Sequence, residues 1–341
     1  MERNGIYETE TPEQREACLR AIQAVQVPLP PLAPCPSERP DVSILLCSFN
    51  RPSHLATLLD QLKCQTYSNF EIIIVGGPDS SYLPDHPPPA TTFFPSSIRS
   101  LGIIRNLSVL LSRGNILLFI DDDSYVMEDF VERHVHLHLY GEGKKAAALQ
   151  GHSLGVPHDH RGNGWVRREC TFRPVGATLH TLHTTNCSIK RQALETIGGF
   201  NMTLRFNAED SELGSRFDRA GYVIRNAPEI VSIHRGAATG GARPRPEEVA
   251  QRIAGRIAEA ALTHISLQRP LRAVLCITKG LEKTFLQNPR VFTRHFSIVM
   301  KESVGYFIRH LKMNSALYRQ KHLEITRTRY LDSGRKVRNL R

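Results

Sequence analysis

The chain has 341 residues, 40% of them hydrophobic and 23% charged, and its formal net charge is +11. Length and composition are those of a globular protein that can bury a full core. Its seven cysteines are scattered, and no two of them have the Cys-x-x-Cys spacing. This excludes a zinc or redox motif and a disulfide framework. No stretch reaches the roughly 18 uninterrupted apolar residues of a membrane span.

The N-terminal stretch MERNGIYETE lacks the basic and then apolar regions of a secretory signal. Unpaired cysteines fit a reducing compartment, so we expect a cytoplasmic protein, soluble or peripheral on the inner face of the membrane. Residues 1–40 are predicted to hold a short helix that begins near Thr11 and Pro12, and then a proline-rich linker over 27–40.

Strands and helices alternate in the next part of the chain. The apolar pattern predicts strands at 42–47, 70–75 and 116–120, and helices at 52–64 and 98–111. Because continuous apolar strands alternate with helices, we expect an α/β fold with a Rossmann-like, mainly parallel sheet flanked by helices. Ligands of such sheets bind outside the carboxyl ends of the strands.

The pattern becomes looser after this region. It predicts helices at 128–140, 194–197 and 210–220, and strands at 146–151, 223–224 and 230–233. His134, His136 and His138 do not form a metal box, because helical side chains at spacing i, i+2 do not face one another. We interpret this stretch as a polar helix.

Three consecutive aspartates, Asp121 to Asp123, directly follow the predicted strand at 116–120. Acids crowded at one strand end repel one another unless a cation neutralises them. A hard divalent cation that also carries substrate phosphates is the usual partner. The alternative is an acidic turn that caps the next helix, but one aspartate would suffice for a cap. The sequence therefore predicts a metal–phosphate site.

Five segments, taken in order, resemble the family 2 glycosyltransferases with the GT-A fold. They are VSILLCSFNRPSHL (42–55), IRSLGIIRNLSVLLSRGNILLFIDDDS (98–124), TTNCSIKRQALETIGGF (184–200), EDSELGSRFDRAGY (209–222) and IHR (233–235). Each is weak alone, and their order is specific. The resemblance implies a nucleotide-sugar-binding half at 41–125 and an acceptor-binding, catalytic half at 126–246. A basic helical extension at 247–341 follows.

The resemblance also implies an activity and a set of residues. It implies inverting transfer of a hexosyl or deoxyhexosyl group from a UDP- or dTDP-sugar to a glycan or lipid-linked acceptor, with Mg²⁺ or Mn²⁺. Asp121, Asp123 and His234 would hold the metal. Asp210 would be the base that accepts the proton of the acceptor hydroxyl, with Glu209 beside it. The implied donor contacts are Ser48, Asn50, Arg51, Asp79, Arg105, Asp121 and Arg243.

Structural roles are the alternatives for several of these residues. Glu209 and Asp210 could be an acidic first helical turn, which the helix dipole favours. Arg105 could form an ion pair with the aspartate cluster, and Arg243 could be a solvated loop charge. The alternative functions are a nucleotidyl or phosphosugar transferase, and a non-catalytic sugar-nucleotide-binding protein. The former needs a lysine in a glycine-rich loop after the first strand, and residues 48–51 provide none.

The C-terminal part carries the whole positive excess, with 16 Lys and Arg against 4 Asp and Glu from Pro270 to Arg341. Its helices could pack on the rest of the protein, lie on an anionic membrane surface, or bind nucleic acid. The family resemblance favours the membrane, because many members use lipid-linked acceptors. No nucleic-acid-binding motif supports the third possibility.

Overall fold

The computed structural model describes most of residues 39–234 and a short C-terminal segment. The described ranges are 39–49, 51–76, 83–84, 86–98, 100–140, 144–155, 168–169, 179, 181–202, 204, 209–234 and 322–332, with isolated positions at 16, 20, 23, 257, 275, 277–279, 282 and 293. Three residues expected to contact the donor, Asn50, Asp79 and Arg243, lie outside these ranges. So do most of the predicted N-terminal helix, the linker and the basic extension.

The first half of the sheet is parallel, as the alternating pattern predicts. Its strands pair in the order β3 (Thr91–Phe94), β2 (Phe70–Gly76), β1 (Val42–Ser48) and β4 (Ile116–Ile120). The helices of this half are α2 (Pro52–Lys63) and α3 (Leu101–Leu111). β3 lies in a proline-rich stretch for which the sequence predicts no strand.

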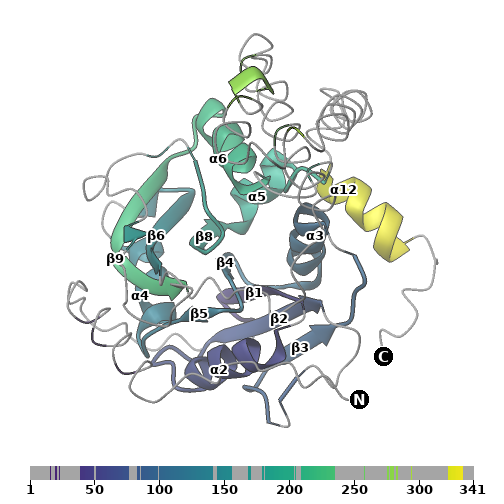
Figure 1. Ribbon diagram of the computed structural model, residues 1–341. Helices are drawn as coiled ribbons and strands as arrows, with labels where there is room; N and C mark the ends of the chain where they lie inside the picture. The colour runs from purple at the N-terminus through teal and green to yellow at the C-terminus, as the bar shows by residue number, and fades with distance from the viewer. Residues whose placement is uncertain are drawn as a thin grey trace.

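Alternate residues of these strands pack against opposite faces of the sheet, because strand side chains alternate. Ile44 and Ile72 belong to the core that contains α2. Leu45 and Ile73 belong to the core that contains α3 and the helices of the second half. Figure 1 shows α2 and α3 on opposite sides of the sheet. The continuous apolar strands thus serve two cores at once.

The second half of the sheet is mixed rather than parallel. Beyond β4 the order continues with β8 (Asn186–Lys190), β6 (Ala148–Gly155), β9 (Ile224–His234) and β5 (Ser124–Tyr125), while β7 (Arg168–Glu169) pairs with β6. β8 is antiparallel to both of its neighbours, β6 is parallel to β9, and β5 is antiparallel to β9. The predicted α/β fold with a helix-flanked sheet is confirmed.

The sheet curls, so that its last strand returns toward the first helix (Figure 1). Two glutamines of this region join α2 to the chain around β5. The side chain of Gln61 accepts a hydrogen bond from the backbone N–H of Val126 at 2.8 Å, and Gln65 donates to the carbonyl of Met127 at 2.8 Å. The curl brings the chain after β4 close to the end of β9.

The two short strands predicted at 223–224 and 230–233 are one strand, β9. Its pairing with β6 shifts register in the middle: Gly151 pairs with Ala227, whereas His152 pairs with Val231. The prediction of separate strands is wrong because a bulge interrupts the apolar pattern without ending the strand. β9 therefore continues as far as His234.

The helices of the second half are close to their predicted positions. They are α4 (Phe130–Leu139), α5 (Arg191–Ile197) and α6 (Glu209–Arg219). Phe130 and Val131 of α4 pack in the core that contains α2. Leu194 of α5 and Leu213 of α6 pack in the core that contains α3. All three predicted helices exist, and their ends differ by a few residues.

Two histidines of α4 are buried, so the prediction of a polar helix is wrong for them. Nδ1 of His134 lies 2.8 Å from Oγ of Ser188, and Nε2 of His138 lies 2.8 Å from the same oxygen. Burial lowers the pKa of each imidazole to about 3, so both are neutral. His134 and His138 are four residues apart and therefore share one helix face, which turns toward Ser188.

The segment 322–332 of the basic extension packs on the rest of the protein. It consists of α12 (His322–Thr326) and the π-helical turn η4 (Arg327–Asp332). The N–H of Leu323 donates to the carbonyl of Gly198 at 2.9 Å, and Asn106 donates to Oγ1 of Thr326 at 3.2 Å. Figure 1 shows α12 beside α3. Within the described ranges, no helix has the length and apolar character needed to cross a membrane.

Candidate active site

The three aspartates form a tight turn at the end of β4. The N–H of Ser124 donates to the carbonyl of Asp121 at 3.2 Å, and the next residues begin β5. Asp121 is partly exposed, whereas Asp122 and Asp123 are buried. The turn therefore sends neighbouring carboxylates to different surroundings.

His234 completes a group of three side chains that could hold a metal ion. The pairing of β5 with β9 places His234 opposite Ser124. Nε2 of His234 lies 3.3 Å from Oδ2 of Asp121 and 3.3 Å from Oδ1 of Asp123. The ligand atoms of the three residues all lie within 4.8 Å of one another. Hydrogen bonds to Asp121 and Asp123 raise the pKa of His234 to about 10.

This donor set fits a divalent cation. Two carboxylates and one imidazole supply part of a coordination shell and leave room for phosphate oxygens and water, as Mg²⁺ and Mn²⁺ require. We call Asp121, Asp123 and His234 the metal trio.

Asp122 lies outside the metal trio and contacts Ser48 and Arg51. Ser48 donates to its Oδ2 at 2.5 Å, and Nη2 of Arg51 lies 2.7 Å from its Oδ1. Burial raises the pKa of Asp122 to about 7, although Arg51 and Ser48 favour the ionised form. Asp122 therefore binds two of the residues expected to contact the donor, Ser48 and Arg51.

Asp210 stands in the first turn of α6 with its carboxylate held from two sides. Oδ1 accepts a hydrogen bond from the N–H of Ser211 at 2.7 Å. Oδ2 accepts from the N–H and the hydroxyl of Thr184, at 3.3 and 3.4 Å. The side chain remains 17% exposed, so the carboxylate is both fixed and reachable.

Glu209 has a different environment from its neighbour. It is buried and forms an ion pair with Arg105, whose guanidinium also lies 5.7 Å from the ring centre of Phe200. Burial raises the pKa of Glu209, and Arg105 opposes this shift. The partner of Arg105 is therefore Glu209 and not the aspartate cluster.

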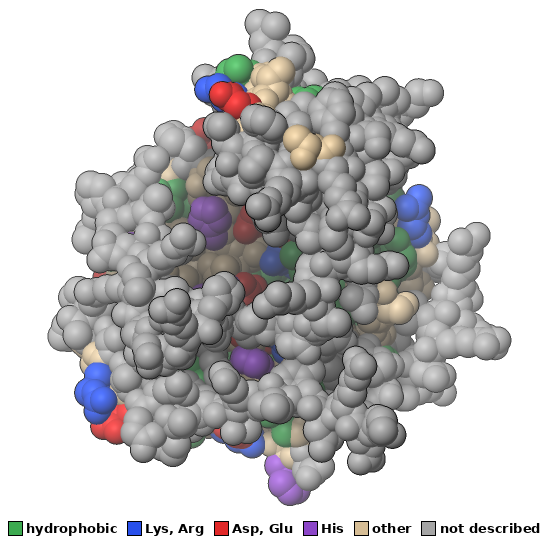
Figure 2. All heavy atoms as spheres, in the orientation of Figure 1, with side chains coloured by type: hydrophobic (Ala, Val, Ile, Leu, Met, Phe, Trp, Pro, Cys, Tyr) green, Lys and Arg blue, Asp and Glu red, His purple; other side chains and the backbone are tan. Residues whose placement is uncertain are grey.

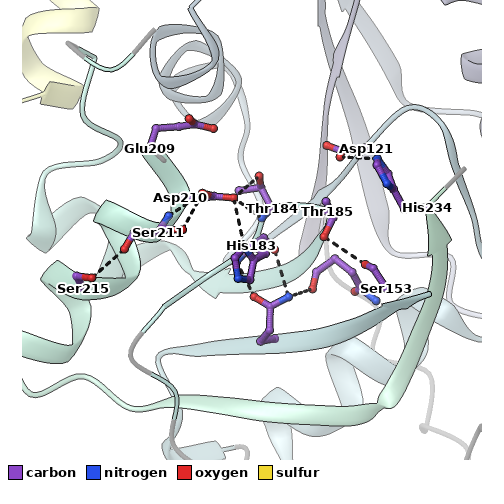
Figure 3. Close-up of polar contacts among 12 residues, drawn as sticks. Asp121, Ser153, His183, Thr184, Thr185, Glu209, Asp210, Ser211, Ser215 and His234 are labelled. Atoms are coloured by element: carbon purple, nitrogen blue, oxygen red, sulfur yellow. Dashed lines mark hydrogen bonds and ion pairs between the residues drawn. The ribbon is translucent and has the colours of Figure 1, made fainter. Parts of the chain in front are cut away.

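The metal trio and Asp210 lie on opposite sides of a hollow. Figure 2 shows that this face of the protein is hollowed at its centre, where acidic, basic and histidine side chains gather. In Figure 3, Asp121 and His234 lie on one side, and Asp210 with Thr184 and His183 lies on the other. The arrangement can bind a cation on one side and accept a proton on the other.

Polar residues of β6 and of the chain just before β8 belong to this region, although the sequence pattern did not single them out. Gln150 of β6 accepts from the N–H of His183 at 2.7 Å and donates to its carbonyl at 3.2 Å. The hydroxyl of Thr185 lies 3.2 Å from that of Ser153 (Figure 3). Only the hydrogen bonds across the sheet distinguish these polar residues from others along the chain.

Comparisons with known proteins agree with the fold and with part of the site. Residues 43–198 match the family described as glycosyl transferase family 2. Over these residues the chain is similar to the family 2 glycosyltransferases. The matched region runs from β1 to the end of α5 and includes the aspartate turn, and it ends before Asp210 and His234. The resemblance inferred from the sequence motifs is confirmed.

Curated relatives of the chain carry glycosyltransferase names. EpsH of Bacillus subtilis is 30% identical over 102 residues, which cover 28% of this chain and 30% of that protein. AglE of Haloferax volcanii is 23% identical over 272 residues, which cover 74% of this chain and 84% of AglE. The match to EpsH thus spans less than a third of its length.

The fold of the chain is also found in a solved glycosyltransferase structure. The crystal structure of TarS from S. aureus has a TM-score of 0.50 and 13% identity, and the match covers 83% of this chain and 55% of TarS. This likeness supports the GT-A fold predicted from the sequence. A shorter form of TarS has been solved in complex with UDP-GlcNAc.

Proposed function

We propose that this chain is an inverting, metal-dependent glycosyltransferase that moves a sugar from a nucleotide-diphosphate sugar to a hydroxyl of a glycan or lipid-linked acceptor. The observation that carries the proposal is the metal trio on one side of a hollow and the fixed, reachable Asp210 on the other (Figure 3). The similarity to the family 2 glycosyltransferases supports the reaction class.

The metal trio forms the donor side of the proposed site. Asp121, Asp123 and His234 would hold Mg²⁺ or Mn²⁺, which stabilises the charge that develops on the leaving diphosphate. UDP- and dTDP-sugars are the first donors to test.

Asp210 forms the acceptor side. Its carboxylate accepts the proton of the acceptor hydroxyl while that oxygen bonds to the anomeric carbon. The bond to the diphosphate breaks on the opposite face, and the diphosphate leaves with the electron pair. Glu209 faces Arg105 in the interior, so it supports the loop and helix around Asp210.

The reaction class can be tested with a panel of nucleotide-diphosphate sugars, with and without Mg²⁺ or Mn²⁺. Nucleoside diphosphate release is measured with water, free glycans and lipid-linked glycans as acceptors in separate arms. We expect metal-dependent release with at least one donor, and an inverted anomeric configuration of the product by NMR. A complete lack of release in every arm would contradict the proposal.

Two substitutions should separate the two sides of the site. Asp123→Ala removes a metal ligand, so we expect it to abolish metal-dependent donor binding, measured by calorimetry. Asp210→Asn keeps the shape but cannot accept the proton, so donor binding should persist while transfer falls at least ~10²-fold. Asp60→Asn, an exposed change on α2, is the control. Full transfer by Asp210→Asn would exclude Asp210 as the base.

A further inference from the structure

One guanidinium joins two of the three aspartates. Nη2 of Arg51 lies 2.7 Å from Oδ1 of Asp122, and Nη1 lies 2.6 Å from Oδ2 of Asp123. Arg51 lies three residues beyond the end of β1 and directly precedes the first residue of α2, Pro52. The planar fork of an arginine can donate to two neighbouring carboxylates at once in a fixed geometry.

The two oxygens of Asp123 have separate partners. Oδ2 receives the hydrogen bond from Arg51 at 2.6 Å, whereas Oδ1 lies 3.3 Å from Nε2 of His234 in the metal trio. A carboxylate held by one oxygen cannot rotate freely about its terminal bond. The contact with Arg51 therefore determines which oxygen of Asp123 faces the other two members of the metal trio, Asp121 and His234.

Asp122 fixes the other end of the fork. Its side chain is fully buried, and Ser48 donates to its second oxygen at 2.5 Å. A buried carboxylate is costly unless charged and hydrogen-bonding partners compensate for the lost water. Arg51 and Ser48 supply these partners, so Arg51 is held firmly against Asp122 while it binds Asp123.

We propose that Arg51, anchored on Asp122, is a positioning residue that orients Asp123 for metal binding. The inference rests on the metal site of the proposed function and adds a role for the middle aspartate, which lies outside the metal trio. Residues that orient metal ligands typically change metal affinity ~10- to 100-fold when they are mutated.

Charge and geometry predict opposite effects for this residue, which makes the inference testable. If Arg51 acted only through its charge, its removal would strengthen the binding of a cation, because one nearby positive charge would be lost. If Arg51 orients Asp123, its removal weakens cation binding. Lysine keeps the charge but presents a single ammonium group that does not reproduce the two-pronged contact.

The experiment measures Mn²⁺ affinity of the full-length chain from the EPR signal of free Mn²⁺. The variants are Arg51→Lys and Arg51→Met, with Arg113→Met as the control, because Arg113 is exposed and pairs with Glu71 away from the aspartates. We expect about 10-fold weaker binding for both Arg51 variants and no change for the control. In an Asp123→Ala background, Arg51→Lys should have no further effect.

The outcomes separate this inference from the proposed function. No Mn²⁺ binding by the unmodified chain would overturn the metal site and, with it, this inference. Normal binding by the unmodified chain and equal binding by Arg51→Lys would overturn the positioning role alone, as would tighter binding by Arg51→Met. Circular dichroism checks the fold, and if Arg51→Met does not fold, the charge-conserving Arg51→Lys decides.

Discussion

At the residue scale, burial keeps His134 and His138, which contact β8, uncharged at neutral pH. His134 and His138 bind the hydroxyl of Ser188, and burial lowers the pKa of each from 6.5 to about 3. In the unfolded chain these imidazoles take up protons near pH 6.5, whereas in the folded chain they do so only near pH 3. Their contribution to stability is therefore complete above pH 6.5 and is lost as the pH falls toward 3.

The acid sensitivity of the protein should consequently depend on His134. We expect His134→Gln to reduce the fall in unfolding free energy between pH 7 and pH 5, because each such imidazole contributes up to about 1.4 kcal/mol per pH unit. Urea unfolding of both proteins at the two pH values measures this. The comparison cancels Asp122, whose raised pKa acts in the opposite direction. His136→Gln on the same helix is the control, and an unchanged pH dependence in His134→Gln would contradict the argument.

At the element scale, the bulge between β6 and β9 determines where His234 lies. Asn186 of β8 occupies the bulge: its Nδ2 donates to the carbonyl of His152 at 3.0 Å and to that of Ile230 at 3.3 Å. Beyond the bulge, Gly155 pairs with His234. The amide of Asn186 therefore stabilises the shift in register that carries β9 to the metal trio.

A methyl group at Gly151 should disturb this junction. A Cβ there would lie 2.5 Å from Oδ1 of Asn186, so the amide must move. We expect Gly151→Ala to cost ~1–3 kcal/mol of stability, by overpacking, and to weaken Mn²⁺ binding. Urea unfolding and Mn²⁺ EPR measure the two effects, with Ser153→Ala on the same strand as the control. Undiminished Mn²⁺ affinity in a folded Gly151→Ala protein would show that the bulge does not position His234.

At the scale of the whole molecule, the C-terminal segment 322–332 packs against residues that lead to both sides of the site. Leu323 packs against the turn at Gly198 and Gly199, which leads into Phe200. The ring of Phe200 lies 5.3 Å from that of Phe119, which precedes the aspartate turn, and it also contacts Arg105. Residues 322–332 thus belong to the folded domain, although they lie in the basic extension.

Removal of this contact should destabilise the whole domain. Leu323 is buried, so we expect Leu323→Ala to lower the free energy of unfolding by ~2 kcal/mol or more. Leu275→Ala, at an exposed position of the same extension, should change it by less than ~0.5 kcal/mol. Urea unfolding compares the two, and equal stabilities would contradict the packing role.

A truncation that removes 322–332 is for this reason a poor test of membrane binding, and salt-dependent vesicle binding by the intact chain is a better one.

The amino-acid sequence by itself determined β1, β2, β4, α2 and α3 of the first half, the aspartate turn and the family resemblance, but not β3. These depend on local patterns: apolar runs, helical spacing, and acids that directly follow a strand. The sequence also pointed to Asp210 and His234, but only through order and resemblance.

Only the tertiary structure decided how those residues work together. Pairing of β5 with β9 brought His234 to Asp121 and Asp123, and the curl of the sheet placed Asp210 opposite them. Contacts with Ser48 and Arg51 set Asp122 apart from the metal trio. Burial made neutral core residues of His134 and His138. Such roles depend on long-range packing and on the local loss of water, which no pattern along one stretch of chain records.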